Sequence, residues 1–144
     1  KKKKKDFFPE YKAARKKNRS ASDLDWNSIF TSLNEIREEI RENLPWKVLH
    51  LDKTEADNII ATLTQQTQEF GMHEPVMIIS SDKDFIQLHK FNNVKQFSPI
   101  QKKLVQDKNP RTYKWNHIMR GDSGDGIPNV LSPDDTFITE QHQN

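Results

Sequence analysis

Apolar residues recur at helical spacing between residues 24 and 44, directly after a strongly basic start. The apolar positions are Leu24, Trp26, Ile29, Phe30, Leu33, Ile36, Ile40 and Leu44. This spacing puts them on one face of a helix. Asp23 or Asp25 can cap its first turn, and Pro45 ends it because proline cannot continue a helix. The pattern predicts an amphipathic helix over residues 24–44.

A strand-like segment and a second helix follow. The segment WKVLHL, residues 46–51, is typical of a short strand. In the next segment, residues 53–71, Thr54 stands three residues ahead of Asp57, which resembles a capping box at the start of a helix. An apolar stripe supports this helix, and Gly71 is expected to end it.

The second half of the chain predicts three more strands. PVMIIS, residues 75–80, is a strand by composition, and Ser81 can cap a short helix that runs to Leu88. VKQFS and KKLVQ, residues 94–98 and 102–106, are expected to pair as a hairpin.

Helices and strands alternate in an order that favours an α/β fold with a parallel sheet and crossover helices. Ligands of such sheets collect outside the carboxyl ends of the strands. Glu55 and Asp57 follow the first predicted strand, and Asp82 and Asp84 follow the second. We therefore expect these four carboxylates to meet at one edge of the sheet.

A third acid pair, Asp122 and Asp125, lies in the loop GDSGDGIP, after a helical stretch around TYKWNHIMR. Each pair alone has an ordinary explanation as a helix cap, a first-turn acid or a turn residue. Three pairs together favour metal binding, because crowded carboxylates repel one another unless a cation lies between them. Oxygen ligands without cysteine favour Mg²⁺ or Mn²⁺, and two such ions can assist hydrolysis of a phosphodiester.

Positive charge is concentrated at the start of the chain. Residues 1–19 hold ten lysines and arginines against two acidic residues, whereas the whole chain has a net charge of +2. A basic arm beside an acidic body suits a polyanionic ligand. The lysine run at 1–5 can equally be a flexible, tag-like tail. In YKAARKKNR, residues 11–19, interleaved apolar residues predict a helix with a basic face.

Composition excludes several classes of protein. The 144 residues are 33% hydrophobic and 31% charged, include no cysteine, and hold no apolar run of membrane-spanning length. We expect a soluble, cytoplasmic protein of about one domain. Nothing in the sequence suggests a Ser/His/Asp triad or a phosphate-binding P-loop. The histidines show no ligand-like spacing and are expected at the surface or in packing roles, and the tryptophans are expected in the core.

Four sequence blocks, in this order, resemble the 5′-nuclease or flap-endonuclease family: FFPEYKAARKKN, TEADNIIATL, ISSDKDFIQLH and RGDSGDGIPNV. The resemblance extends to about residue 131 and is greatest to the phage members. It implies a PIN-like α/β core with the start of a helix–three-turn–helix element that grips duplex DNA. It also implies two bound Mg²⁺ ions, for which Mn²⁺ can substitute.

Carried over residue by residue, the resemblance assigns roles to the acids and to the basic arm. The metal ligands would be Glu55, Asp57, Asp82, Asp84, Asp122 and Asp125. The catalytic residues would be Glu55, Asp57, Asp82, Asp84, Lys12 and Arg15, the last two holding the scissile phosphate. The DNA-binding residues would be Lys12, Arg15, Lys16, Lys17, Arg19, Gly124 and Gly126.

The resemblance divides the chain into a basic arch segment (1–22), a partial nuclease core (23–108) and a partial helix–three-turn–helix region (109–144). Asn58 stands where the family commonly has another aspartate, and Asn129 stands where many members have glycine. Family members also carry N-terminal strands with two further aspartates, and additional C-terminal helices. The sequence is therefore expected to be a fragment.

Three functions are compatible with these features. The first is a metal-dependent, structure-specific 5′→3′ nuclease that removes 5′ flaps and RNA primers in RNA–DNA hybrids during DNA replication. The others are a non-catalytic nucleic-acid-binding fragment, with strongly salt-dependent binding, and a PIN-type ribonuclease specific for RNA. Expected partners are forked or 5′-flap DNA and RNA–DNA hybrid, with a single-strand-binding protein or sliding clamp as further candidates. The full-length protein is expected to be a monomer that does not bind membranes.

Overall fold

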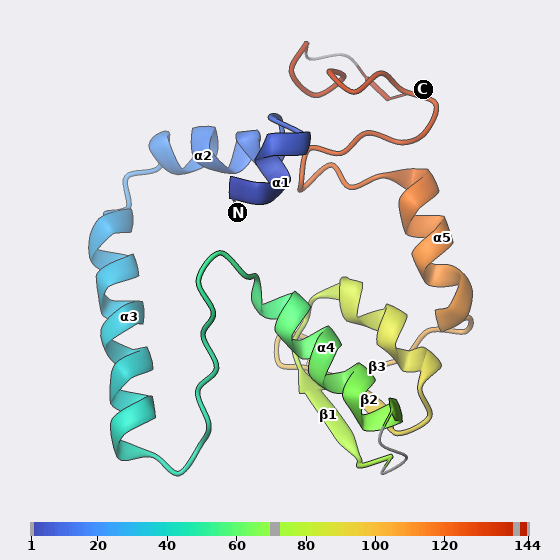
Figure 1. Ribbon diagram of the computed structural model, residues 1–144. Helices are drawn as coiled ribbons and strands as arrows, with labels where there is room; N and C mark the ends of the chain where they lie inside the picture. The colour runs from blue at the N-terminus through green and yellow to red at the C-terminus, as the bar shows by residue number, and fades with distance from the viewer. Residues whose placement is uncertain (1, 70–72, 140–141, 144) are drawn as a thin grey trace.

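The computed structural model of the chain describes residues 2–69, 73–139 and 142–143. Its elements are, in chain order, α1 (Lys2–Phe7), α2 (Ala13–Ser20), α3 (Trp26–Asn43), α4 (Ala56–Glu69), β1 (Val76–Ile79), the 3₁₀ helix η1 (Lys83–Lys90), β2 (Val94–Ser98), β3 (Lys103–Val105) and α5 (Pro110–Arg120). Figure 1 shows α4, η1 and the strands gathered in one body, with α3 on the opposite side of the molecule. The predicted α/β class is confirmed.

The sheet has three strands in the order β1-β2-β3. β1 and β2 run parallel, with Val76 opposite Val94, and η1 is the connection between them. β2 and β3 form the predicted antiparallel hairpin, with Phe97 opposite Leu104. The sheet is therefore mixed, and the hairpin accounts for its antiparallel pair.

The core lies between the sheet, η1 and α4. Ile78 of β1, Phe85 of η1 and Val94 of β2 form its buried cluster, and Ile60 of α4 packs against them. Short apolar strands bury side chains where a helix covers the sheet, which removes apolar surface from water. This small core fixes the start of η1, which carries two of the predicted acids.

The predicted strand at 46–51 is wrong. Residues 47–51 have no regular secondary structure, no segment within the described ranges pairs with them, and Leu49 and Leu51 are exposed. A strand is stabilised by hydrogen bonds to a neighbouring strand, so apolar composition alone does not produce one. Glu55 therefore precedes α4 without following a strand.

The helix predicted over 24–44 is confirmed as α3, and Asp25 caps it. The Asp25 carboxylate accepts hydrogen bonds from the backbone N–H groups of Asn27 (3.1 Å) and Ser28 (3.2 Å). The apolar face of α3 stays largely open, and none of its residues is buried. The expectation of core tryptophans is wrong for Trp46 and Trp115, which are 67% and 64% exposed, whereas Trp26 is half-buried.

Two further details differ from the sequence predictions. Asp82, and not Ser81, caps η1, because its Oδ1 accepts the N–H of Asp84 at 2.9 Å. The Ser81 hydroxyl instead shares a 2.7 Å hydrogen bond with that of Ser98 on β2. The lysine run contributes residues to α1. The predicted helix end at Gly71 lies outside the described residues.

In the part of the chain that the structure describes, every helix is too short or too polar to cross a bilayer.

Candidate functional site

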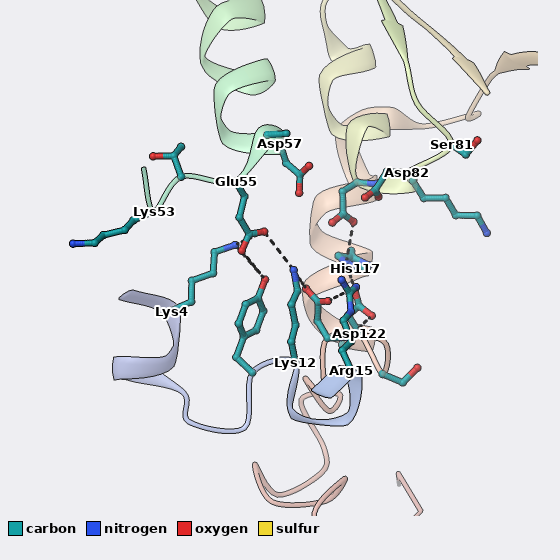
Figure 2. A pocket seen from close by; sticks show the side chains of 18 of the residues that line it. Lys4, Lys12, Arg15, Lys53, Glu55, Asp57, Ser81, Asp82, His117 and Asp122 are labelled. Atoms are coloured by element: carbon teal, nitrogen blue, oxygen red, sulfur yellow. Dashed lines mark hydrogen bonds and ion pairs between the residues drawn. The ribbon is translucent and has the colours of Figure 1, made fainter. Parts of the chain in front are cut away.

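One cavity of about 1380 Å³ lies where the start of α4, the start of η1, the loop after α5 and the segment around α2 approach one another. It is lined by all of the acids predicted as metal ligands and by both basic residues predicted as catalytic. These residues are Lys12, Arg15, Glu55, Asp57, Asp82, Asp84, Asp122 and Asp125. Figure 2 shows the acids of α4 and η1 on one side of the pocket and Lys12 reaching toward them from the other. Segments far apart in sequence thus meet at one site, while the roles of these residues stay predictions.

Lys12 and Arg15 hold the basic segment against two of the acids. The Lys12 Nζ lies 3.3 Å from Glu55 Oε2 and 3.5 Å from Asp125 Oδ2. The Arg15 Nη2 lies 2.8 Å from Asp125 Oδ1, and its Nε donates to the Gly124 carbonyl at 3.3 Å. The Lys12 N–H also donates to the Asp125 carbonyl at 2.8 Å. Glu55 and Asp125 are therefore already neutralised by cations of the chain itself.

Lys12 adopts a backbone conformation that costs energy. Its φ is 57°, in the left-handed region, at the position before α2. L-residues adopt this region at a cost of about 1–2 kcal/mol, and surrounding contacts must compensate. The ion pairs and the backbone hydrogen bond to Asp125 supply these contacts, so the conformation and the charge placement of Lys12 depend on each other.

Lys4 and Tyr11 belong to the site, although the sequence prediction missed them. Tyr11 is 5% exposed, and its hydroxyl donates to Glu55 Oε1 at 3.5 Å. The Nζ of Lys4 lies 3.6 Å from Glu55 Oε2, and the ammonium groups of Lys4 and Lys12 lie 5.2 and 4.7 Å from the centre of the Tyr11 ring. Lys4 sits within a uniform lysine run, where no sequence signal distinguishes it from its neighbours.

The electrostatics of Glu55 follow from these neighbours. Partial burial acts to raise the pKa of its carboxyl, but Lys12 and Lys4 outweigh burial and lower that pKa below its ordinary value. The pKa values of Lys12 and Lys4 are raised despite burial, by the hydrogen bond to Tyr11 and by the nearby carboxylates. On this side of the pocket, the charged groups of Lys4, Lys12 and Glu55 therefore each have a partner of opposite charge.

The other half of the pocket is crowded with carboxylates. The pKa of Asp84 is raised, first by burial and then by the charge of Asp82, with smaller contributions from Asp122 and Asp125. His117 opposes this shift. A carboxylate that is costly to ionise beside other carboxylates is the environment that a divalent cation stabilises.

Asp84, His117 and Asp122 form a group that could hold a metal ion, since their ligand atoms lie within 4.8 Å of one another. Asp84 is in the first turn of η1, His117 is on α5, and Asp122 follows Gly121 at the end of that helix. His117, expected at the surface or in a packing role, therefore lies beside two of the predicted acids. Chain spacing could not reveal it, because the packing of α5 on η1 brings Asp84 to this histidine.

The remaining predicted residues divide into two sets. Asp57 points into the pocket in Figure 2, and the exposed Asp82 caps η1 beside it. Lys17 and Arg19 lie on α2 outside the lining of the cavity, where the Arg19 Nε donates to the Arg15 carbonyl at 3.3 Å. Lys16 is also in α2, but its side chain lies outside the described part.

Gly124 and Gly126 lie in the loop that holds Asp122 and Asp125. The Gly124 N–H donates to Asp122 Oδ1 at 2.8 Å, and the Gly126 N–H donates to the Ser123 carbonyl at 3.2 Å. The backbone N–H groups of these two glycines, which were predicted to bind DNA, therefore donate hydrogen bonds within the loop. Their role in DNA binding stays a prediction.

Gly121 sets the direction of this loop, and alanine there should be poorly tolerated. Its φ is +73°, and an added Cβ would lie 2.5 Å from the carbonyl oxygen of Ile127. We expect Gly121→Ala to lower the free energy of unfolding by at least about 2 kcal/mol, measured by denaturant titration.

Gly124→Ala is the matched control for this change. Its φ is not positive, and its Cβ would meet only a side-chain oxygen, Asp122 Oδ1, at 3.2 Å. Equal destabilisation by the two alanines would contradict the role given to Gly121.

Comparison with known proteins identifies the family. The family model described as "5'-3' exonuclease, N-terminal resolvase-like domain" matches residues 1–116. The chain belongs to this family. The resemblance found in the four sequence blocks is thereby confirmed, and the mixed sheet with its helices agrees with a resolvase-like, PIN-like α/β domain.

Individual members of the 5′-3′ exonuclease family extend this comparison. The chain is 38% identical over 136 residues to the ribonuclease H of Enterobacteria phage T4, across 93% of this chain and 44% of that protein. It is 33% identical over 131 residues to a 5′-3′ exonuclease of Buchnera aphidicola subsp. Schizaphis graminum, across 86% and 42%. It is 29% identical over 134 residues to DNA polymerase I of Mycobacterium tuberculosis, across 85% and 14%. The chain thus spans less than half the length of each of these relatives.

Proposed function

We propose that the protein is a metal-dependent 5′→3′ nuclease that hydrolyses the phosphodiesters of 5′ flaps and of RNA primers in RNA–DNA hybrids. One observation carries the proposal: acids from three separate segments and a basic segment line the same pocket. Membership of the 5′-3′ exonuclease family supports the reaction class. The names of the relatives, a ribonuclease H, a 5′-3′ exonuclease and DNA polymerase I, support a role in DNA replication.

The donor set fits a divalent cation, and we propose Mg²⁺ as the physiological ion, with Mn²⁺ as a substitute. Asp57, Asp82, Asp84 and Asp122 line the pocket without a lysine or arginine ion pair among the described residues. They are the residues that would hold the ions. When bound, such ions supply an activated water and charge stabilisation at the phosphate.

The basic residues would position the phosphate. Arg15 can form paired hydrogen bonds with phosphate oxygens through its planar guanidinium, and Lys12 supplies a compact charge beside it. Both now contact Asp125, with shortest distances of 2.8 Å for Arg15 and 3.5 Å for Lys12. A phosphate in the pocket would share these cations with that carboxylate. We extend the proposal to forked DNA and RNA–DNA hybrid as the nucleic-acid partners.

Cleavage assays on the full-length protein test this function. The substrates are a 5′-flap duplex and an RNA primer annealed to DNA, each assayed with Mg²⁺ and with EDTA. We expect release of short 5′ products in Mg²⁺ and none in EDTA. A closed circular single strand, which has no 5′ end, is the matched control substrate. Degradation of the circle at the same rate, or cleavage in EDTA, would refute the proposal.

A further inference from the structure

His117 directs its ring into the acid-rich half of the pocket. The residue lies on α5, and its side chain is 25% exposed. The ring of Tyr113, one turn earlier, stacks against it with centroids 5.8 Å apart and an angle of 13° between the planes. This stacking holds the ring so that Nε2 faces Asp84 and Asp122.

The contacts of the His117 ring are poor as hydrogen bonds. Nε2 lies 3.4 Å from Asp84 Oδ1 and 3.8 Å from Asp122 Oδ2, longer than the about 2.7–2.9 Å of a charge-assisted N–H···O bond. Nδ1 is buried and has no hydrogen-bond partner in the described part of the chain. The hydrogen bonds of the ring therefore do not explain why Nε2 is directed at the two carboxylates.

The same distances fit three ligands around a common centre. Ligand atoms bound to one ion at about 2.0–2.2 Å stand roughly 3 Å apart when adjacent and about 4 Å apart when opposite. Separations of 3.4 and 3.8 Å, within a group whose ligand atoms all lie within 4.8 Å, require only a small contraction.

We propose that His117 is a nitrogen ligand of the metal position formed by Asp84 and Asp122, and that it shifts the preference of this position from Mg²⁺ toward Mn²⁺. Mg²⁺ is bound almost entirely by oxygen, whereas imidazole is a good ligand for transition ions. The inference rests on the proposed function, because it concerns the metal site of that pocket. It adds a ligand of a different chemical class to the expected carboxylates.

Pulsed electron paramagnetic resonance of Mn²⁺ bound to the full-length protein tests the proposal directly. A histidine nitrogen in the coordination shell couples to the electron spin of Mn²⁺ and gives nitrogen modulation of the echo. We expect this modulation in the wild-type protein and its loss in His117→Gln, which replaces the nitrogen ligand by an amide that still offers an oxygen. His50→Gln is the matched control, because His50 lines the same cavity but is not part of the ligand group.

Calorimetric titration of the same three proteins gives a second readout. Because loss of a group that merely supports a ligand typically costs about 10–100-fold in metal affinity, His117→Gln should weaken Mn²⁺ binding by at least about tenfold. Its Mg²⁺ affinity should change much less, so the ratio of the two Kd values moves toward Mg²⁺. His50→Gln should leave both affinities unchanged.

The outcomes separate this proposal from the proposed nuclease activity. Bound Mn²⁺ without nitrogen modulation, or equal loss of Mn²⁺ and Mg²⁺ affinity in His117→Gln, overturns the ligand role of His117 even if flaps are still cleaved in Mg²⁺. Failure of Mn²⁺ to bind also overturns it. Nitrogen modulation together with absence of flap and primer cleavage would support the metal site and refute the nuclease.

Discussion

Asp84→Asn is expected to reduce metal-dependent cleavage by at least about 100-fold and, at the same time, to raise the thermal stability of the metal-free protein. Loss of a group that only supports a metal ligand commonly costs about 10–100-fold, so loss of a ligating carboxylate should cost more. An asparagine of nearly the same shape keeps the packing of η1. The two effects have opposite signs, which distinguishes a functional acid from a structural one.

The sign of the stability change follows from the pKa of Asp84. Burial, and then the charge of Asp82, raise the pKa of this carboxyl in the folded protein above its ordinary value of 3.8. Such a group contributes stability below its unfolded pKa and loses that contribution as the pH rises through the folded pKa. At neutral pH the ionised carboxylate is therefore unfavourable in the fold, and asparagine removes the charge.

Thermal unfolding in EDTA at pH 7 and at pH 3.5 measures this difference. The melting temperature of Asp84→Asn should exceed that of wild type at pH 7, and the gain should shrink at pH 3.5. Asp23→Asn, which removes an exposed charge before α3, is the control and should change neither stability nor cleavage. A lower melting temperature for Asp84→Asn at pH 7 would contradict the unfavourable ionisation of Asp84 in the fold. Cleavage within about tenfold of wild type would contradict its role as a metal ligand.

Lys12→Ala is expected to reduce cleavage by about 10²–10³-fold, because loss of one preorganised charged donor at a reacting group has effects of this size. It should also lower the free energy of unfolding by roughly 1–3 kcal/mol, since Glu55 and Asp125 each lose a charged partner in a half-buried site. Denaturant titration and single-turnover cleavage measure the two effects separately.

Lys12→Gly separates the backbone from the charge. Glycine adopts the φ of 57° without the cost that alanine has there, so Lys12→Gly should be about 1 kcal/mol more stable than Lys12→Ala. Both variants lack the ammonium group and should be equally slow in cleavage. If glycine restored cleavage, the backbone conformation of residue 12, and not its charge, would be the functional feature.

Local signals in the sequence predicted the elements that depend mainly on neighbouring residues. A cap at Asp23 or Asp25 and the apolar spacing behind it predict α3 within two residues at each end, and the hairpin of β2 and β3 follows from two short β-prone segments. The strand at 46–51 failed because pairing with another segment decides whether an extended stretch becomes a strand. Ser81 was the predicted cap of η1, but the Asp82 carboxylate caps this helix. The Ser81 hydroxyl instead forms a hydrogen bond with the Ser98 hydroxyl.

The sequence predicted those residues of the site that form a pattern unusual for an ordinary protein surface. Paired acids in short motifs are unusual enough to be noticed, and the fold brings all six into one pocket. Lys4 and His117 were not noticed, because their importance comes from tertiary contacts to Glu55 and Asp84. Contacts of this kind leave no periodic signal in the chain.

If the protein binds nucleic acid and a cation as proposed, the pairing of Lys12 and Arg15 with Asp125 makes the two ligands mutually dependent. A phosphate that attracts these two side chains weakens their hold on Asp125 and leaves its carboxylate more negative toward an incoming ion. By thermodynamic reciprocity, an ion that occupies the acid cluster must strengthen phosphate binding by the same factor. Under the proposed function, cooperativity between substrate and metal would thus follow from one shared carboxylate.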